Sequence, residues 1–136
     1  MKNAFEKTWQ AVKTSLPIMA AVLMLVSLLN PVFEKYYPRI FTGSYIFDPF
    51  IGAVMGSFSF GMPIVSYVTG GELLEQGVSL LAVTAFVFSW TTVGIPMLPL
   101  EAAHLGKKFA IIRNGLNFIF SVLVAILTVA TLEIIQ

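Results

Sequence analysis

The residues of this chain that point to chemistry are hydroxyls beside helix-breaking residues. Two Gly-x-Pro elements, Gly61–Pro63 and Gly94–Pro96, each have a hydroxyl residue two positions before the glycine, Ser59 and Thr92. A proline inside a helix leaves the carbonyl four residues earlier without its hydrogen bond, so these two carbonyls are expected to be free. Free carbonyls attract cations, and the N-termini of half-helices attract anions. The pattern therefore predicts a site in which two broken helices hold a small polar or anionic solute by dipoles.

The expected translocation pathway consists of the two breaks and the polar side chains around them. Its residues are Ser59, Gly61, Pro63, Ser66, Tyr67, Thr69, Ser89, Thr92, Gly94 and Pro96. Charged residues near the ends of the same segments are candidates for a gate, namely Glu72, Glu101 and Arg113. The alternative interpretation is that each proline only kinks a helix and that each glycine only permits close packing.

Catalytic and metal-binding chemistry is not expected. No Ser–Lys, Ser–His or paired-Asp arrangement lies inside an apolar segment, and the chain has no Cys to act as a nucleophile. Glu101 and His104 have the Glu-x-x-His spacing of carboxylate-bridged metal sites, but one copy of this motif supplies only two ligands. We therefore expect no enzymatic activity, no metal and no cofactor, and we interpret the pair as part of a polar loop.

The charges are few, and long apolar segments separate them. Charged residues make up 11% of the chain and hydrophobic residues 57%, whereas a soluble domain has about 25% charged residues. Uncharged runs of 20, 23, 25 and 19 residues follow Lys13, Asp48, Glu75 and Arg113. Each run is long enough to cross roughly 30 Å of hydrocarbon as a helix. This composition excludes an ordinary soluble enzyme and a disordered chain, and the net charge of +1 offers little to nucleic acid.

The sequence therefore predicts an all-α integral membrane protein in contact with lipid, with about four hydrophobic helical segments in one domain, 1–136. Residues 1–13 predict an interfacial helix, and the alternative is that they extend the first span. The further segments are a span at 14–33, a broken or re-entrant hairpin at 49–71, a broken span at 78–100 and an unbroken span at 114–135. Between the first two lies an expected loop, 34–47.

Two local patterns add detail to these segments. Asp48 and Pro49 predict an N-cap followed by the first helical position. In the last segment, small and weakly polar residues fall on one helical face, as is typical of helix–helix contacts in membranes. These residues are Asn114, Asn117, Ser121, Ala125 and Thr128.

The basic residues favour a re-entrant hairpin over four full spans. Four spans would place three basic residues on one side and five on the other, which gives little orientation signal and leaves dual topology as an alternative. A hairpin at 49–71 would place six basic residues on one side and only Lys35 and Arg39 on the other. The six are Lys2, Lys7, Lys13, Lys107, Lys108 and Arg113. This distribution predicts a multi-pass protein of the plasma or inner membrane with a cytoplasmic amino terminus.

The run from Gly61 to Leu74, Gly-Met-Pro-Ile-Val-Ser-Tyr-Val-Thr-Gly-Gly-Glu-Leu-Leu, resembles the central motif of the YraQ-type predicted permease family, which is related to the organoarsenical efflux permeases. The similarity continues through Val83–Phe86, Pro99–Ala102 and Leu105–Asn114, and it covers roughly residues 50–125. Members of that family are about twice this length and consist of two related halves, each with a Gly-x-Pro element. The resemblance implies that this chain is a half-length permease.

A half-length chain with two breaks at membrane depth would expose unsatisfied backbone to lipid if it were monomeric. We therefore expect a homodimer or a higher homo-oligomer that transports a small polar or anionic solute through a site formed by the broken helices. The alternatives are a passive channel and a non-transporting membrane subunit of a larger complex.

Overall fold

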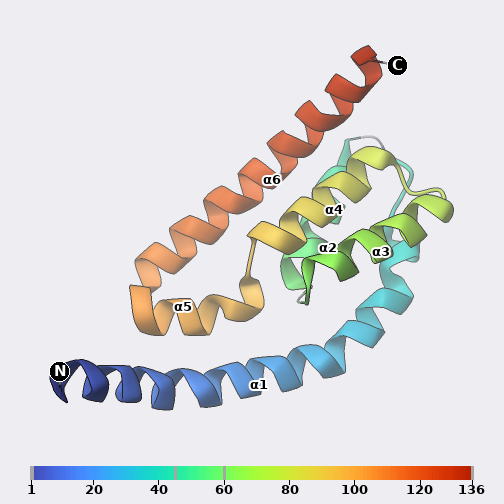
Figure 1. Ribbon diagram of the computed structural model, residues 1–136. Helices are drawn as coiled ribbons and strands as arrows, with labels where there is room; N and C mark the ends of the chain where they lie inside the picture. Colours follow the sequence, from blue (N-terminus) through green and yellow to red (C-terminus); the bar gives the residue numbers. More distant parts are fainter. Residues whose placement is uncertain (1, 45, 60, 136) are drawn as a thin grey trace.

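The computed structural model describes residues 2–44, 46–59 and 61–135, with the backbone alone at some positions of the first helix (Figure 1). Phe60, within the first expected break, and residue 1 of the expected interfacial helix lie outside the described residues. Over the described residues the chain is all-helical, as the sequence predicts. The helices are α1 (Lys2–Ile40), α2 (Phe47–Phe58), α3 (Pro63–Glu75), α4 (Leu80–Thr92), the short 3-10 helix η1 (Ile95–Met97), α5 (Leu98–Leu105) and α6 (Lys107–Ile135).

The first helix is longer than expected. α1 is one continuous helix of 39 residues, so residues 2–13 extend the helix of 14–33 and the predicted loop from Glu34 onwards is wrong as far as Ile40. The prediction ended this element where the apolar run ends. A charge ends an apolar run without breaking a helix, because glutamate and lysine are good helix formers. α1 runs beside α5 and then bends towards α3 (Figure 1).

The broken segment 49–71 forms a helical hairpin. Gly52 of α2 lies against Ala82 of α4, and Gly56 lies against Phe86, so α2 and α4 run parallel. Gly70 of α3 lies against Val83 and Val87, whereas Gly61, which precedes α3, lies beside Trp90. α3 therefore runs antiparallel to α4, and the chain turns back between α2 and α3 at the Gly-x-Pro element, where the sequence places a break.

The closest helix contact of the molecule lies between α2 and α4. A Cβ atom added to Gly52 would lie 2.3 Å from the Ala82 carbonyl oxygen, and one added to Gly56 would lie 2.3 Å from the Phe86 carbonyl oxygen. The two glycines form a Gly-x-x-x-Gly motif, which brings helix backbones together in membranes. The sequence analysis did not identify this motif, although its spacing is visible in the sequence.

Buried hydroxyls join the same two helices. Ser57 Oγ and Ser89 Oγ lie 2.7 Å apart, and each lies within hydrogen-bond distance of the Ala53 carbonyl oxygen, at 2.7 and 2.5 Å. Interhelical hydroxyl bonds of this kind stabilise helix pairs where no water competes. Ser89, expected on the translocation pathway, therefore lies inside the α2–α4 contact.

The expected small-residue face of α6 packs on this pair of helices. Asn114, Ser121 and Ala125 are buried, and Asn117 and Thr128 are partly buried. The contact includes Ala53 of α2, Leu81 and Ala85 of α4, and Ala125 and Val129 of α6. The helix–helix role predicted for this face is confirmed.

The expected N-cap at Asp48 is wrong. α2 begins at Phe47, with Ile46 in the N-cap position, so Asp48 lies in its first turn. The Asp48 carboxylate is 1% exposed and accepts hydrogen bonds from the preceding loop. Its donors are Thr42 N (3.0 Å), Thr42 Oγ1 (2.9 Å) and Gly43 N (3.0 Å). The aspartate therefore holds the α1–α2 connection instead of capping the helix.

Two stretches of the described chain are long and apolar enough to cross a membrane. They are Leu80–Leu105, which contains α4, η1 and α5, and Lys107–Ile135, which is α6. Only 17% of the apolar window in α6 is buried within the molecule, so most of its side chains face outwards. A long apolar helix with this exposure favours a membrane location.

Candidate functional site

The two Gly-x-Pro breaks meet at one cavity. This cavity has a volume of about 220 Å³ and lies where α2 turns into α3 and where α4 ends. It draws residues from both breaks and from α5 and α6. The lining residues are Gly61, Pro63, Trp90, Thr91, Thr92, Val93, Gly94, Met97, Glu101 and Arg113. Six of the residues expected on the pathway or at the gate are therefore brought together: Gly61, Pro63, Thr92, Gly94, Glu101 and Arg113.

The first break is formed by the end of one helix and the start of another. α2 ends at Phe58, and Ser59 is extended, with its N–H bonded back to Met55 and Gly56 carbonyls. Pro63 is the first residue of α3. A proline in this position loses no helical hydrogen bond, because the first N–H groups of a helix have no partner within it. The proline therefore starts a helix, whereas the sequence analysis placed it inside one.

The hydroxyls around the first break point to backbone instead of the cavity. Ser59 Oγ donates to the Met55 carbonyl (3.0 Å), and Ser66 Oγ donates to the Pro63 carbonyl (2.6 Å). Both serines are buried, and neither lines the cavity. Their hydroxyl protons are therefore taken by carbonyls of their own helices, and their expected contact with solute stays a prediction.

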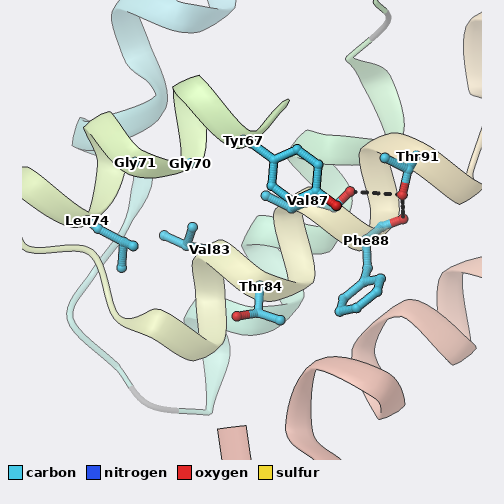
Figure 2. Close-up of a pocket in the computed structure, with 9 residues that line it drawn as sticks. All are labelled: Tyr67, Gly70, Gly71, Leu74, Val83, Thr84, Val87, Phe88 and Thr91. Atoms are coloured by element: carbon cyan, nitrogen blue, oxygen red, sulfur yellow. Dashed lines mark hydrogen bonds between the residues drawn. The ribbon is translucent and has the colours of Figure 1, made fainter. Parts of the chain in front are cut away.

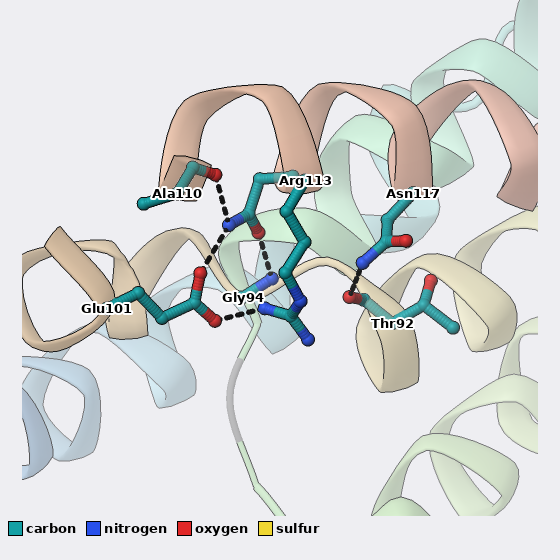
Figure 3. Close-up of polar contacts among 7 residues, drawn as sticks. Thr92, Gly94, Glu101, Ala110, Arg113 and Asn117 are labelled. Carbon is teal, nitrogen blue, oxygen red and sulfur yellow. Dashed lines mark hydrogen bonds and ion pairs between the residues drawn. The ribbon is translucent and has the colours of Figure 1, made fainter. Parts of the chain in front are cut away.

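Two asparagines of α6 satisfy the second break (Figure 3). Gly94 N donates to Asn114 Oδ1 at 2.7 Å, and Asn117 Nδ2 donates to the Thr92 carbonyl at 2.8 Å. The carbonyl that the sequence analysis expected to be free at Thr92 therefore has a partner. Asn114 and Asn117 were expected only as packing residues, and their partners lie 20 and 25 positions away, beyond the reach of a local pattern.

Glu101 and Arg113 form an ion pair at the cavity (Figure 3). Arg113 Nη1 donates to Glu101 Oε1, and Asn114 Nδ2 donates to Glu101 Oε2 at 2.9 Å. The Glu101 side chain is 17% exposed and that of Arg113 is 42% exposed. Both expected gate residues are thus at the cavity, and the carboxylate is the more enclosed of the two. Glu72, the third, is exposed near the far end of α3 and does not line the cavity.

Trp90 contributes a hydrogen-bond donor without a partner. The residue is 6% exposed, packs edge-to-face on Phe86 with ring centroids 5.4 Å apart, and has no hydrogen-bond partner for Nε1 among the described residues. Its Cζ2 lies 3.4 Å from the position of a Cβ at Gly61. Cζ2 and Nε1 are bonded to the same ring carbon, so Nε1 is two bonds from the ring atom that lies beside the first break. The sequence analysis did not identify Trp90, because a tryptophan in an apolar run gives no polar signal.

The remaining pathway residues lie elsewhere. Tyr67 lines a second pocket of about 300 Å³ between α3 and α4, whose other lining residues are mostly apolar (Figure 2). Thr69 is buried in α3, and Pro96 lies in η1 without lining the cavity. Their expected contact with solute in the break cavity is therefore not supported.

Glu101 and His104 face different partners. His104 Nε2 lies 2.6 Å from Ser15 Oγ of α1, whereas Glu101 pairs with α6. Among the described residues, no group of three His, Cys, Asp or Glu side chains has the arrangement of a metal site. The His104–Ser15 contact instead joins α5 to α1.

Comparisons with protein-family models, with curated proteins and with solved structures found no match for this chain.

Proposed function

We propose that this chain is one half of a small membrane permease, which moves a small polar or anionic solute through the cavity between its two breaks. The observation that supports this proposal most strongly is the convergence of Gly61–Pro63 and Gly94 on one cavity, although they lie far apart in the sequence. Transporters commonly bind solutes between discontinuous helices, at the point where their backbones unwind.

The position of the cavity along the helices agrees with a site at membrane depth. α2 has 12 residues and is about 18 Å long, so the turn lies past the centre of a hydrocarbon core of roughly 30 Å if the open end of the hairpin lies at one interface. Non-helical backbone at this depth is tolerated where protein buries it or where it lines a cavity. At the second break, asparagines of α6 cover the backbone, and both breaks line the cavity.

The outer face of the hairpin supports a homo-oligomer. Met62, Ile64 and Val68 are 73%, 68% and 60% exposed, at the start of α3 and one turn beyond it. In the proposed assembly a second copy covers this face, most simply as a dimer that restores the two halves of a permease. Lys107, Lys108 and Arg113 lie at the cavity end of α6, which is the cytoplasmic end in the proposed orientation.

Filling the cavity is expected to stop transport without unfolding the protein. The variant is Gly61→Leu, because this glycine lines the cavity and a Cβ there would meet only the Trp90 ring at 3.4 Å. The matched control is Gly115→Leu on α6, where a Cβ meets nothing within 4 Å. Swelling of proteoliposomes in acetate, nitrate, urea or glycerol, followed by light scattering, measures the flux.

We expect the wild-type protein and Gly115→Leu to pass at least one of these solutes with a rate that saturates, and Gly61→Leu to fall to the rate of empty liposomes at an unchanged melting temperature. Wild-type flux in Gly61→Leu would rule out this cavity as the pathway. Absence of flux in the wild-type protein for all four solutes would count against a permease and favour a non-transporting subunit.

A further inference from the structure

We infer that the solute of the break cavity is a small anion, held by the indole N–H of Trp90 and the guanidinium of Arg113. The inference names the substrate class of the proposed permease and to that extent rests on the proposed function. It is carried by the hydrogen-bonding capacity that remains in the cavity after the contacts within the chain are counted.

Several polar groups at the cavity are engaged by the chain. Both oxygens of Glu101 accept hydrogen bonds, from Arg113 and Asn114, and the Thr92 carbonyl accepts one from Asn117. The hydroxyl protons of Thr91 and Thr92 are donated to the Phe88 carbonyl, at 3.0 and 2.7 Å. After donating these protons the two hydroxyls keep lone pairs but have no proton to offer, so the hydrogen bonds that a ligand accepts must come from other residues.

Two side chains at the cavity have donor capacity left. Trp90 Nε1 is buried and has no partner among the described residues, and burying such a donor costs about 1–3 kcal/mol unless something accepts its hydrogen bond. Arg113 carries five N–H groups, and its described hydrogen bond engages only Nη1. A solute rich in acceptors complements both residues, and a guanidinium suits carboxylates and other oxyanions.

The positive member of the ion pair at the cavity is the one with hydrogen bonds left to make. Glu101 and Arg113 are the charged residues among those that line the cavity, and they form a pair of net charge zero. α3 begins at the cavity with Pro63 and α4 ends there at Thr92, so helix ends contribute partial charges of both signs. Since Glu101 is already bonded to two donors of the chain, the positive side of the pair is the side left for a ligand.

Trp90 can report directly on the ligand. The chain has two tryptophans, and the Trp9→Phe variant leaves Trp90 as the only one. Excitation at the red edge of the absorption band, where tyrosine does not absorb, then selects Trp90. This variant is titrated in detergent with sodium acetate and with sodium nitrate, and the same titrations of Arg113→Gln in this background control for ionic strength. Urea and glycerol are the neutral comparisons.

We expect a saturable change in Trp90 emission with acetate or nitrate and none with urea or glycerol. Arg113→Gln in the same background should weaken anion binding at least tenfold, and Arg113→Lys should lose less because it keeps the charge. The matched control is Lys108→Gln, which removes the same charge from α6 outside the cavity lining and should bind as the parent does. Equal binding in Arg113→Gln and Lys108→Gln would overturn the inference.

Trp90→Phe provides a second test that does not depend on the ion pair. It keeps an aromatic ring beside Phe86 and removes the N–H group, and calorimetry should show at least tenfold weaker anion binding in the otherwise unchanged chain. Unchanged affinity would overturn the role of the indole. A response to phosphatidylglycerol in the micelles but to no free anion would also overturn the inference, because it would assign the site to a lipid headgroup.

The inference and the proposed function fail in different ways. Anion binding that depends on Trp90 and Arg113, without flux in proteoliposomes, would support the anion site and contradict the permease. Saturable flux of urea or glycerol, with no binding of acetate or nitrate, would support the permease and overturn the anion site.

Discussion

Replacing Gly56 by alanine should destabilise the protein by about 1–3 kcal/mol, the usual cost of forcing atoms into a packed contact. The added Cβ would lie 2.3 Å from the Phe86 carbonyl oxygen and 2.9 Å from Trp90 N, which are both backbone atoms of α4. Backbone cannot rotate out of the way as a side chain can, so α2 and α4 must move apart. Thermal unfolding in detergent, followed by circular dichroism, measures the loss as a lower melting temperature.

Gly115→Ala is the matched control for this change, and it should have the opposite sign. Gly115 lies inside α6, where an added Cβ meets nothing within 4 Å. Alanine is more favourable than glycine in a helix interior by about 0.5–1 kcal/mol. Equal melting temperatures for the two variants would show that α2 and α4 do not pack as closely as described.

The loss at Gly56 should extend to the cavity. The α2–α4 contact places Trp90 beside the turn at Gly61, and it aligns Ser57 with Ser89 at 2.7 Å. Separation of the helices would displace the indole from the first break. Gly56→Ala should therefore also weaken anion binding, whereas Gly115→Ala should leave the affinity unchanged.

Replacing Asn114 by alanine should destabilise the protein by about 1–3 kcal/mol. Asn114 is 5% exposed and makes three hydrogen bonds: it accepts from Gly94 N at 2.7 Å and donates to Glu101 Oε2 and the Ala110 carbonyl at 2.9 and 3.0 Å. Without it, the N–H at the second break and one carboxylate oxygen lose their partners. A fully buried unpaired group costs about 1–3 kcal/mol, and these two groups are partly buried, so the range is expected for the two together.

Asn117→Ala is the comparison for this prediction, because Asn117 makes a single described bond, to the Thr92 carbonyl, and is only partly buried. Asn117→Ala should lower the melting temperature by less than half as much as Asn114→Ala does. Asn114→Asp should also destabilise, since it keeps an acceptor for Gly94 N but places a second carboxylate beside Glu101. If Asn114→Ala and Asn117→Ala have the same melting temperature, the stability of the second break does not depend on Asn114.

The positions of the breaks were predictable from the sequence, and the roles of the polar residues around them were not. Gly-x-Pro is a local signal, and the chain leaves its helices at Ser59 and at Val93, close to both predicted breaks. Which hydroxyl faces the cavity depends on helix rotation and on partners far along the chain. Ser89 shows the difference, because its hydroxyl was expected to contact solute and instead joins α4 to α2.

The end of α1 and the hydrogen-bond donors at the cavity were also not predictable from a local pattern. The first helix was predicted to end near Glu34 because the apolar run ends there. The residues that follow still favour a helix, and α1 continues to Ile40. In the sequence, Trp90 is one apolar residue among many. The structure shows that its ring lies beside Gly61 and that its N–H is buried without a partner among the described residues. Glu101 and Arg113 were predicted as gate residues from their charge and their position at segment ends. That they pair with each other is shown only by the structure.

The central claim of this account is that α2 and α3 form a hairpin that enters and leaves the membrane on one side, so that the break cavity lies at depth. The chain has no native Cys, so single Cys variants can be labelled with an impermeant maleimide. The sites are Ser44 before α2, Gln76 after α3 and Lys108 at the start of α6, and none of them is buried. In sealed vesicles, we predict that Ser44→Cys and Gln76→Cys are labelled from the same side and Lys108→Cys from the opposite side. Labelling of Gln76→Cys from the side opposite to Ser44→Cys would contradict the claim, because it would require α2 and α3 to cross the membrane as one full span.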